Sequence, residues 1–141
     1  MQDRFKFRCW DKENKCMLYP HRYSNFCNVN GTIVKIESYP ISNTAYRGKR
    51  ISYEFDDASL MQCTGLKDKN GKLIYENDIV KFKFDNDVII AVVTWDGYET
   101  GFYLNTTDYF KDKYVTDYDI CEGFIFEVIG NVHENKELLN E

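Results

Sequence analysis

The sequence predicts a mainly β fold, with a small SH3-like barrel in the C-terminal half and a smaller β-rich or α+β unit in the N-terminal half. Aromatic residues make up 16% of the 141 residues, and aromatic rings pack well across β-strands. Short segments that alternate polar and apolar residues follow one another, and turn residues separate them. We therefore predict two subdomains, residues 1–73 and 74–141, that together form one compact unit.

The N-terminal half begins with a predicted β-hairpin. Alternation over residues 4–9 would place Phe5, Phe7 and Cys9 on one face of a strand and three basic side chains on the other. A polar turn then leads to a second short strand over residues 16–19.

The rest of this half carries weaker signals. Strands are predicted over residues 32–36 and 51–55. The polar residues 38–50 between them include a proline and a glycine and are expected to form a loop. Residues 20–30 show no regular pattern, and an aspartate N-cap predicts a brief helical turn that ends at Met61.

The C-terminal half is more regular. The turn Lys67–Lys72 contains Asn-Gly, and both of these residues adopt positive φ at little cost. Four or five closely spaced strands follow, and closing them into a barrel would remove their exposed edges. The predicted elements are strands over residues 79–84, 88–95 and 124–132, a strand that begins at Phe102, a long polar loop over residues 105–122, and a last turn capped by Asn135.

The net charge of −5 is unevenly distributed along the chain. Residues 1–54 carry ten Lys and Arg against five Asp and Glu, a local net charge of +5, whereas residues 55–141 carry eight against eighteen, a local net charge of −10. Such asymmetry is typical of an oligomer that pairs unlike halves or of a protein with a charged partner, but solubility alone also explains it.

Hydropathy and cysteine spacing indicate the cellular location. The longest apolar run, Val88 to Val93, is too short to cross a membrane, and no secretory signal pattern is visible, so we expect a soluble chain with no membrane partner. The five cysteines are odd in number and form no Cys-x-x-Cys pair. Free thiols in a reducing cytoplasm are therefore expected.

Three segments of the chain carry a family resemblance: Phe5–Met17, Leu60–Val80 and Glu127–Leu139. The middle segment, from Gln62 to Gly71, is the most distinctive. It is similar to the pattern Gln-Tyr-Thr-Gly-Leu-Lys-Asp-Lys-Asn-Gly of the YopX family of phage and prophage proteins. The first segment resembles the opening Lys-Phe-Arg-Ala-Trp-Asp pattern of that family, so the resemblance spans nearly the whole chain.

The resemblance implies phage origin, a location in the cytoplasm of the bacterial host and an accessory role, and it supplies no established activity. Some positions depart from the family pattern. Cys9 stands where Ala is usual, Cys63 where Tyr or Phe is usual, and His133 where Tyr is frequent. These departures indicate that the three side chains do not form a reaction site common to the family.

Catalytic, metal and cofactor chemistry finds little support in the sequence. Motifs for nucleophilic hydrolysis, zinc proteolysis, phosphate loops and dinucleotide binding are absent from it. The calcium-loop pattern that begins at Asp68 fails because Ile79 stands where a Glu ligand is needed. We therefore predict a non-enzymatic protein with no metal and no cofactor. Residue types that can bind a metal form one cluster in the sequence: Cys9, Cys16, His21 and Cys27. Their spacing is wider than the spacing of ligands in zinc sites, and we interpret them as core residues.

Two surfaces are candidates for binding. The first hypothesis is a module that binds a host or phage protein, or assembles into a homo-oligomer, through the acidic aromatic stretch Asp85 to Glu122. The alternative is a nucleic-acid-binding barrel that uses the basic N-terminal strand, which the acidic C-terminal half disfavours. A third reading assigns the aromatic residues to the core. The candidate partner residues are Tyr98, Tyr109, Tyr114 and Tyr118, and the candidate nucleic-acid contacts are Arg4, Lys6, Arg8 and Trp10.

Overall fold

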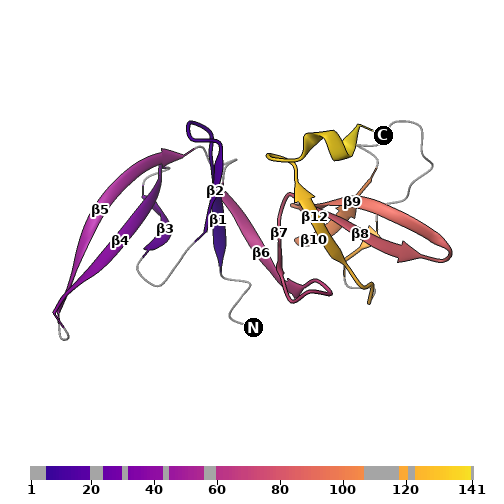
Figure 1. Ribbon diagram of the computed structural model, residues 1–141, viewed down its shortest axis with the longest axis horizontal. Coiled ribbons are helices and arrows are strands. Elements are labelled where there is room, and N and C mark those ends of the chain that lie inside the picture. Colours follow the sequence, from indigo (N-terminus) through magenta and orange to yellow (C-terminus); the bar gives the residue numbers. More distant parts are fainter. Residues whose placement is uncertain are drawn as a thin grey trace. The chain divides into compact units, whose positions relative to one another are not determined.

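The computed structural model confirms the mainly β prediction (Figure 1). It describes residues 6–19, 24–29, 32–42, 45–55, 60–106, 118–120 and 123–140, with the backbone alone for 24–29, 32–42, 45–55 and 118–119. Within these residues the only helix is the short 3₁₀-helix η3, and no helix is long and apolar enough to span a membrane. The elements are β1 (Phe7–Asp11), β2 (Cys16–Leu18), β3 (Ser24–Val29), β4 (Thr32–Ser42), β5 (Ala45–Phe55), β6 (Leu60–Lys67), β7 (Leu73–Tyr75), β8 (Asp78–Phe84), β9 (Asp87–Asp96), β10 (Gly101–Asn105), β11 (Tyr118–Asp119), β12 (Glu127–Asn131) and η3 (Lys136–Leu139).

The chain divides into two compact units, and the division falls inside β6. Lys6–Gln62 form the N-terminal unit, and the C-terminal unit takes up the chain from Cys63. The reason is strand pairing: the first residues of β6 pair with β1, whereas Cys63 and Lys67 pair with β7. The division thus lies earlier in the sequence than the predicted boundary after residue 73.

In the N-terminal unit, the predicted hairpin is confirmed as β1 paired with β2. Its turn is held by Asp11, whose carboxylate accepts hydrogen bonds from the backbone N–H groups of Glu13 and Asn14 and from the side-chain amide of Asn14. These bonds hold the pKa of Asp11 below its ordinary value, because they stabilise the charged carboxylate. A polar turn of this kind fixes the register in which the two strands pair.

The region between the hairpin and β6 contains more β-structure than predicted. β3, β4 and β5 form an antiparallel sheet, so the irregular segment predicted over residues 20–30 and the loop predicted over residues 38–50 are both wrong in part. Pro40 had indicated a loop over residues 38–50, because proline lacks the N–H that a strand needs for pairing. Pro40 is tolerated because it lies beyond the part of β4 that pairs with β3 and beside a register shift against β5.

The predicted helical turn ending at Met61 is also wrong where the structure describes it, since Leu60 and Met61 begin β6. Met61 and Cys63 are fully buried, and the residues between and after them are less buried. This period of two is the signature of a strand with one covered face. The predicted capping aspartates at positions 56 and 57 lie outside the described residues.

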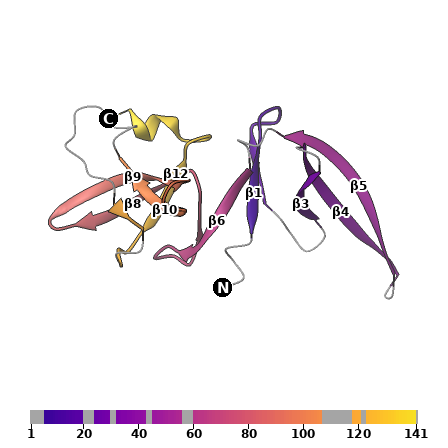
Figure 2. The ribbon, with the colours of Figure 1, turned by 180° about the vertical axis from the view of Figure 1, so that it is seen from behind.

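The C-terminal unit is built on an antiparallel sheet in the order β11-β10-β9-β8-β12 (Figures 1 and 2). The strands predicted over residues 79–84 and 88–95 are confirmed as β8 and β9, and the strand predicted at Phe102 is β10. The last strand is shorter than predicted, because residues 123–126 are not paired as a strand. β7 was not predicted.

The two faces of this sheet are covered differently. One face carries the main core, whose buried members are Ile74, Val80, Phe82, Ala91, Val93, Leu104, Ile120 and Phe126. On the other face, Ile79 and Val92 are buried against Leu139 of η3. The predicted cap residue Asn135 does precede η3, but its side chain accepts a hydrogen bond from the N–H of Asn131 instead of capping the helix.

Candidate functional site

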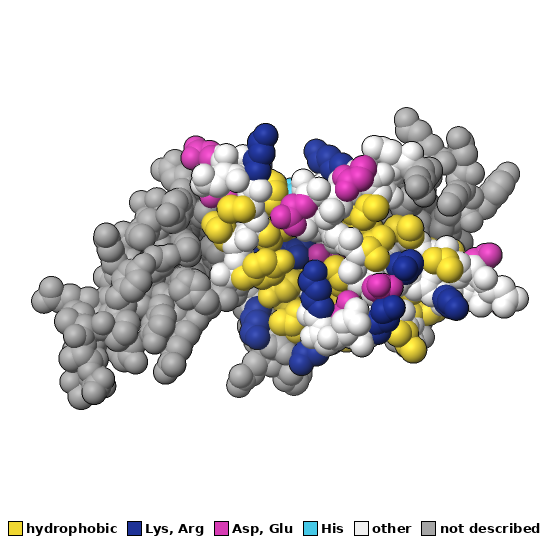
Figure 3. All heavy atoms as spheres, viewed as in Figure 1, with side chains coloured by type: hydrophobic (Ala, Val, Ile, Leu, Met, Phe, Trp, Pro, Cys, Tyr) yellow, Lys and Arg dark blue, Asp and Glu magenta, His cyan; other side chains and the backbone are white. Residues whose placement is uncertain are grey.

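A groove of about 650 Å³ lies in the C-terminal unit, beside β8 and the beginning of β12. Three lysines and one carboxylate line it, together with apolar side chains from β8, β9 and residues 124–125. Pockets of this size are typical of binding sites. Basic side chains in the lining contrast with the acidic C-terminal half as a whole. On the described part of the molecule, hydrophobic and basic side chains lie next to one another (Figure 3).

Strand alternation explains why two of the lysines face the groove together. In β8, Lys81 and Lys83 are two residues apart and therefore point to the same side of the sheet. Lys83 lies opposite Val88 of β9, and Lys81 lies opposite Glu127 of β12. Ile79 continues the same row and is covered by η3. Lys81, Lys83 and Val88 are therefore the groove residues on the sheet face that η3 partly covers, whereas Phe82 and Phe124 of the lining belong to the main core or pack against it.

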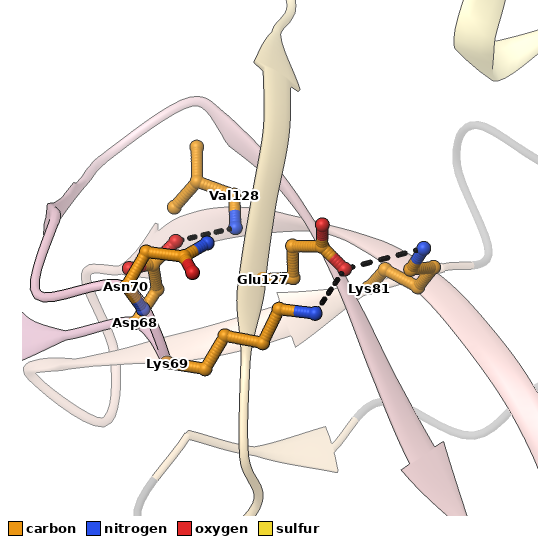
Figure 4. Close-up of polar contacts among 6 residues, drawn as sticks. All are labelled: Asp68, Lys69, Asn70, Lys81, Glu127 and Val128. Atoms are coloured by element: carbon orange, nitrogen blue, oxygen red, sulfur yellow. Dashed lines mark hydrogen bonds and ion pairs between the residues drawn. The ribbon is translucent and has the colours of Figure 1, made fainter.

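Glu127 joins two of the three lysines across the groove (Figure 4). Its Oε2 atom lies 3.0 Å from Nζ of Lys69 and 3.2 Å from Nζ of Lys81. Hydrogen bonds from these two amines lower the pKa of Glu127 below its ordinary value, because they favour the charged carboxylate. Lys83 is exposed and makes no ion pair with the carboxylates in the described ranges.

The apolar side of the groove is formed by aromatic and aliphatic groups. The Phe124 ring packs against Phe82 and Phe84, with ring centroids 4.7 and 5.9 Å apart. Ile125 and Val88 are 76% and 58% exposed. Large apolar side chains with this much exposure next to paired charges are characteristic of an interaction surface.

Lys69 is carried to the groove by the turn Lys67–Lys72, which Asp68 organises (Figure 4). The buried Asp68 carboxylate accepts hydrogen bonds from the N–H groups of Asn70 and Lys72 at 2.9 Å and of Val128 at 3.1 Å. Burial raises the pKa of Asp68, but these bonds and the Lys72 charge outweigh burial and lower it. The N–H of Lys69 also donates to the carbonyl of Phe126.

The predicted Asn-Gly turn is thus confirmed, with one difference in its backbone. Gly71 has a φ of 81°, whereas Asn70 does not adopt positive φ. The Asp68 carboxylate accepts a hydrogen bond from the N–H of Asn70, in addition to the backbone hydrogen bond from the N–H of Gly71 to the Asp68 carbonyl. Asp68 is therefore a structural residue of the turn, and its oxygens are occupied by backbone N–H groups.

The predicted partner residues are described only in part. Tyr98 lies in the turn between β9 and β10 and is 98% exposed. Tyr118 lies in β11, where the backbone alone is described, and Tyr109 and Tyr114 lie outside the described residues. Of these four side chains, the structure therefore places Tyr98 alone on the surface, and it does not line the groove.

The predicted basic row of the N-terminal strand is interrupted at its centre. Arg8 is 1% exposed, and its guanidinium lies 3.5 Å from the hydroxyl of Tyr19. Because the neighbouring Cys9 is also buried, both sides of β1 are covered there, and the expectation that Arg8 faces solvent is wrong. Lys6 is exposed and Trp10 is half-buried. Arg4, the other residue of this predicted contact set, lies outside the described residues.

The cysteines with described side chains are free thiols: Cys9, Cys16 and Cys63. Burial, with a smaller contribution from the nearby Asp11 charge, raises the pKa of Cys9 to about 12, so this thiol is protonated and unreactive. His21 lies outside the described residues, and Cys27 is described by its backbone alone. In the part of the chain with described side chains, no three His, Cys, Asp or Glu residues converge as a metal site.

The lining of the groove was not identified from the sequence, although one signal was present. Alternation in β8 places Lys81 and Lys83 on one face, and Val88 begins the strand that pairs back on it. Lys69 and Glu127 carry no such signal. Pairing of β12 with β8 brings Glu127 there, and the hydrogen bonds of the turn to Phe126 and Val128 bring Lys69.

Comparisons with known proteins show the family of this chain. The model of the family described as YopX protein matches residues 6–140. The crystal structure of protein EF1440 from Enterococcus faecalis is similar, with 30% sequence identity and a TM-score of 0.60, covering 95% of this chain and 96% of that chain. No curated protein matches this sequence. The resemblance seen in the three sequence segments is thereby confirmed: this chain belongs to the YopX family.

Proposed function

We propose that this chain is a non-enzymatic protein-binding module and that the groove beside β8 and β12 is its binding site. The observation that carries the proposal is the combination of three lysines with exposed apolar side chains in one groove. Exposed apolar groups supply the area that a partner buries, and the lysines supply orientation and electrostatic steering.

A protein partner fits this surface better than nucleic acid does. The lysines act over roughly one Debye length, about 8 Å at physiological salt. A short protein segment would experience this local positive field, whereas a nucleic-acid strand would extend over the acidic remainder of residues 55–141. The proposed basic strand for nucleic acid also loses its central contact, because Arg8 is buried.

The composition of the groove supports binding over catalysis. Its lining contains lysine amines and one carboxylate, and no Ser, Cys, His or Tyr is among the described residues that form it. Two of the three amines are engaged by Glu127. A nucleophile held by a neighbouring base is the arrangement that covalent catalysis needs, and this set of side chains does not supply one.

The wider setting of the proposal follows from the family. We propose that the protein is encoded by a phage or prophage and acts as an accessory protein in the bacterial cytoplasm. Its partner would be a host or phage protein, and it would also be able to bind further copies of itself. We also propose that the C-terminal unit is a small barrel of the SH3-like kind. In support, the turn Lys67–Lys72 is joined to β12 and the residue before it by two hydrogen bonds. The N–H of Val128 donates to the Asp68 carboxylate, and the N–H of Lys69 donates to the carbonyl of Phe126.

Affinity capture with groove variants tests the proposal. Tagged wild-type protein, Lys83→Glu and a matched control, Lys136→Glu, would each be incubated with a bacterial lysate, with and without nuclease. Lys83 lines the groove, whereas Lys136 is an exposed lysine of η3 outside it, so the two substitutions change the net charge equally. Circular dichroism would verify that all three proteins are folded.

The expected result is a stoichiometric protein partner that survives nuclease, persists with Lys136→Glu and is lost with Lys83→Glu. A partner retained equally by both variants would show that the groove is not the binding site. Partners that disappear with nuclease would replace the proposal with nucleic-acid binding.

A further inference from the structure

We infer that the occupant of the groove is a short acidic segment of the partner with a bulky apolar side chain, and that Glu127 is the internal competitor for its carboxylate. This inference rests on the proposed function and adds the chemistry of the partner to it. Charge complementarity and the placement of Glu127 between two amines carry the argument.

The apolar part of the occupant is indicated by the walls of the groove. Phe124 provides a ring that packs against Phe82, and Ile125 and Val88 of the same lining leave apolar surface exposed. Covering such surface contributes roughly 25 cal/mol per Å². A ring or branched aliphatic side chain has the shape to cover it, and hydrophobic anchors of this type contribute most of the affinity in peptide grooves.

The acidic part is indicated by Lys83. Its amine is exposed and lies on the same sheet face as Val88, so a segment with an apolar anchor there would place its neighbouring residue beside this amine. A carboxylate is the protein group that complements an amine at this position. The paired amines of Lys69 and Lys81 lie further along the same groove.

Glu127 shows how an acidic group is held at those two amines. One oxygen of its carboxylate contacts both Nζ atoms, which is the geometry that a partner carboxylate would adopt in its place. Because Lys69, Lys81 and Glu127 remain partly exposed, the bridges are screened by water and are weak. An incoming carboxylate can therefore exchange with Glu127 at small cost.

Fluorescence anisotropy with synthetic peptides on the full-length protein tests this inference. The probe is fluorescein-labelled Gly-Asp-Glu-Leu-Phe-Asp-Glu-Gly. One control peptide replaces the four acids by their amides, a second replaces Leu-Phe by Ala-Ser, and a labelled thymidine oligonucleotide represents nucleic acid. The acidic apolar peptide is expected to bind at least about tenfold more tightly than each control, and less tightly at high salt.

Variants then assign the binding to individual side chains. Lys83→Glu is expected to weaken peptide binding about tenfold, and Lys136→Glu less than about twofold. Glu127→Gln removes the competing charge and is expected to tighten binding about threefold. If Glu127 only held the structure together, this variant would bind the peptide equally or more weakly, and that result would overturn its role as competitor.

The outcomes separate this inference from the proposed function. If Lys83→Glu abolishes capture of a lysate protein but no acidic peptide binds, the groove is the binding site and the acidic chemistry is wrong. Stronger binding of the amide peptide or of the oligonucleotide would also overturn the acidic segment. If the acidic peptide binds wild type and Lys83→Glu equally, both the inference and the choice of groove fail.

Discussion

The turn that Asp68 organises and the groove that Glu127 lines both contact β12, and both rest on a carboxylate whose pKa is lowered. The partners of the two carboxylates differ. Asp68 is buried and accepts backbone N–H groups, whereas Glu127 is partly exposed and contacts lysine amines. Backbone N–H groups in a closed turn have no alternative acceptor in the folded state. Lysine amines at the surface can change their ion-pair partner at little cost in free energy. The first carboxylate is therefore structural, whereas the second is the one that our proposal assigns to the binding site.

The largest effect is expected from Asp68→Ala. This change leaves the N–H groups of Asn70, Lys72 and Val128 without their acceptor and should lower the free energy of unfolding by about 2–4 kcal/mol. Urea denaturation measures the loss. Asp87→Ala, at an exposed position at the start of β9, should change stability by less than about 0.5 kcal/mol. Equal effects at the two positions would remove the distinction between a structural carboxylate and a surface one.

An intermediate effect is expected from one pair of substitutions in β9. Val93 is fully buried in the main core, whereas Val88 lies 58% exposed in the groove. Val93→Ala should cost about 2–3 kcal/mol of unfolding free energy through lost burial and a cavity, and Val88→Ala less than about 0.5 kcal/mol. Thermal or urea unfolding compares them. A large loss with Val88→Ala would mean that the groove wall is part of the core.

The smallest expected effect is the loss of stability of the folded protein as the pH is lowered. Because the folded-state pKa of Asp68 lies below its ordinary value of 3.8, its contribution to stability is present above that value and is lost as the pH falls through the folded-state pKa. The free energy of unfolding should therefore fall more steeply with acid in wild type than in Asp68→Asn, which has no charge to lose. Urea titrations between pH 6 and pH 3 measure both slopes. Parallel curves for the two proteins would show that another group controls the acid response.

Local signals in the sequence were reliable for β8, β9 and the turn of residues 67–72. The β-branched residues of β9 predicted a strand, and the Asn-Gly pair predicted the turn. The family pattern around Gly65 and Gly71 was also readable, and the family comparison confirms it.

Predictions failed where the local signal and the tertiary context disagree. Pro40 indicated a loop, yet β4 extends through it, since Pro40 lies beyond the part of β4 that pairs with β3 and beside a register shift against β5. Alternation placed Arg8 in solvent, yet Arg8 and its neighbour Cys9 are both buried, so both faces of β1 are covered there. Neither outcome can be read from a window of adjacent residues.

The sequence by itself determined that this protein is mainly β, that its C-terminal half pairs neighbouring strands through short polar turns, and that it belongs to the YopX family. Only the tertiary structure decided which face of β8 is covered. A period of two assigns Lys81 and Lys83 to one face of the sheet, but η3 and the Asp68 turn come from distant parts of the chain. They cover Ile79 and bring Lys69 to Glu127, because strand pairing and turn hydrogen bonds join segments that no local pattern relates.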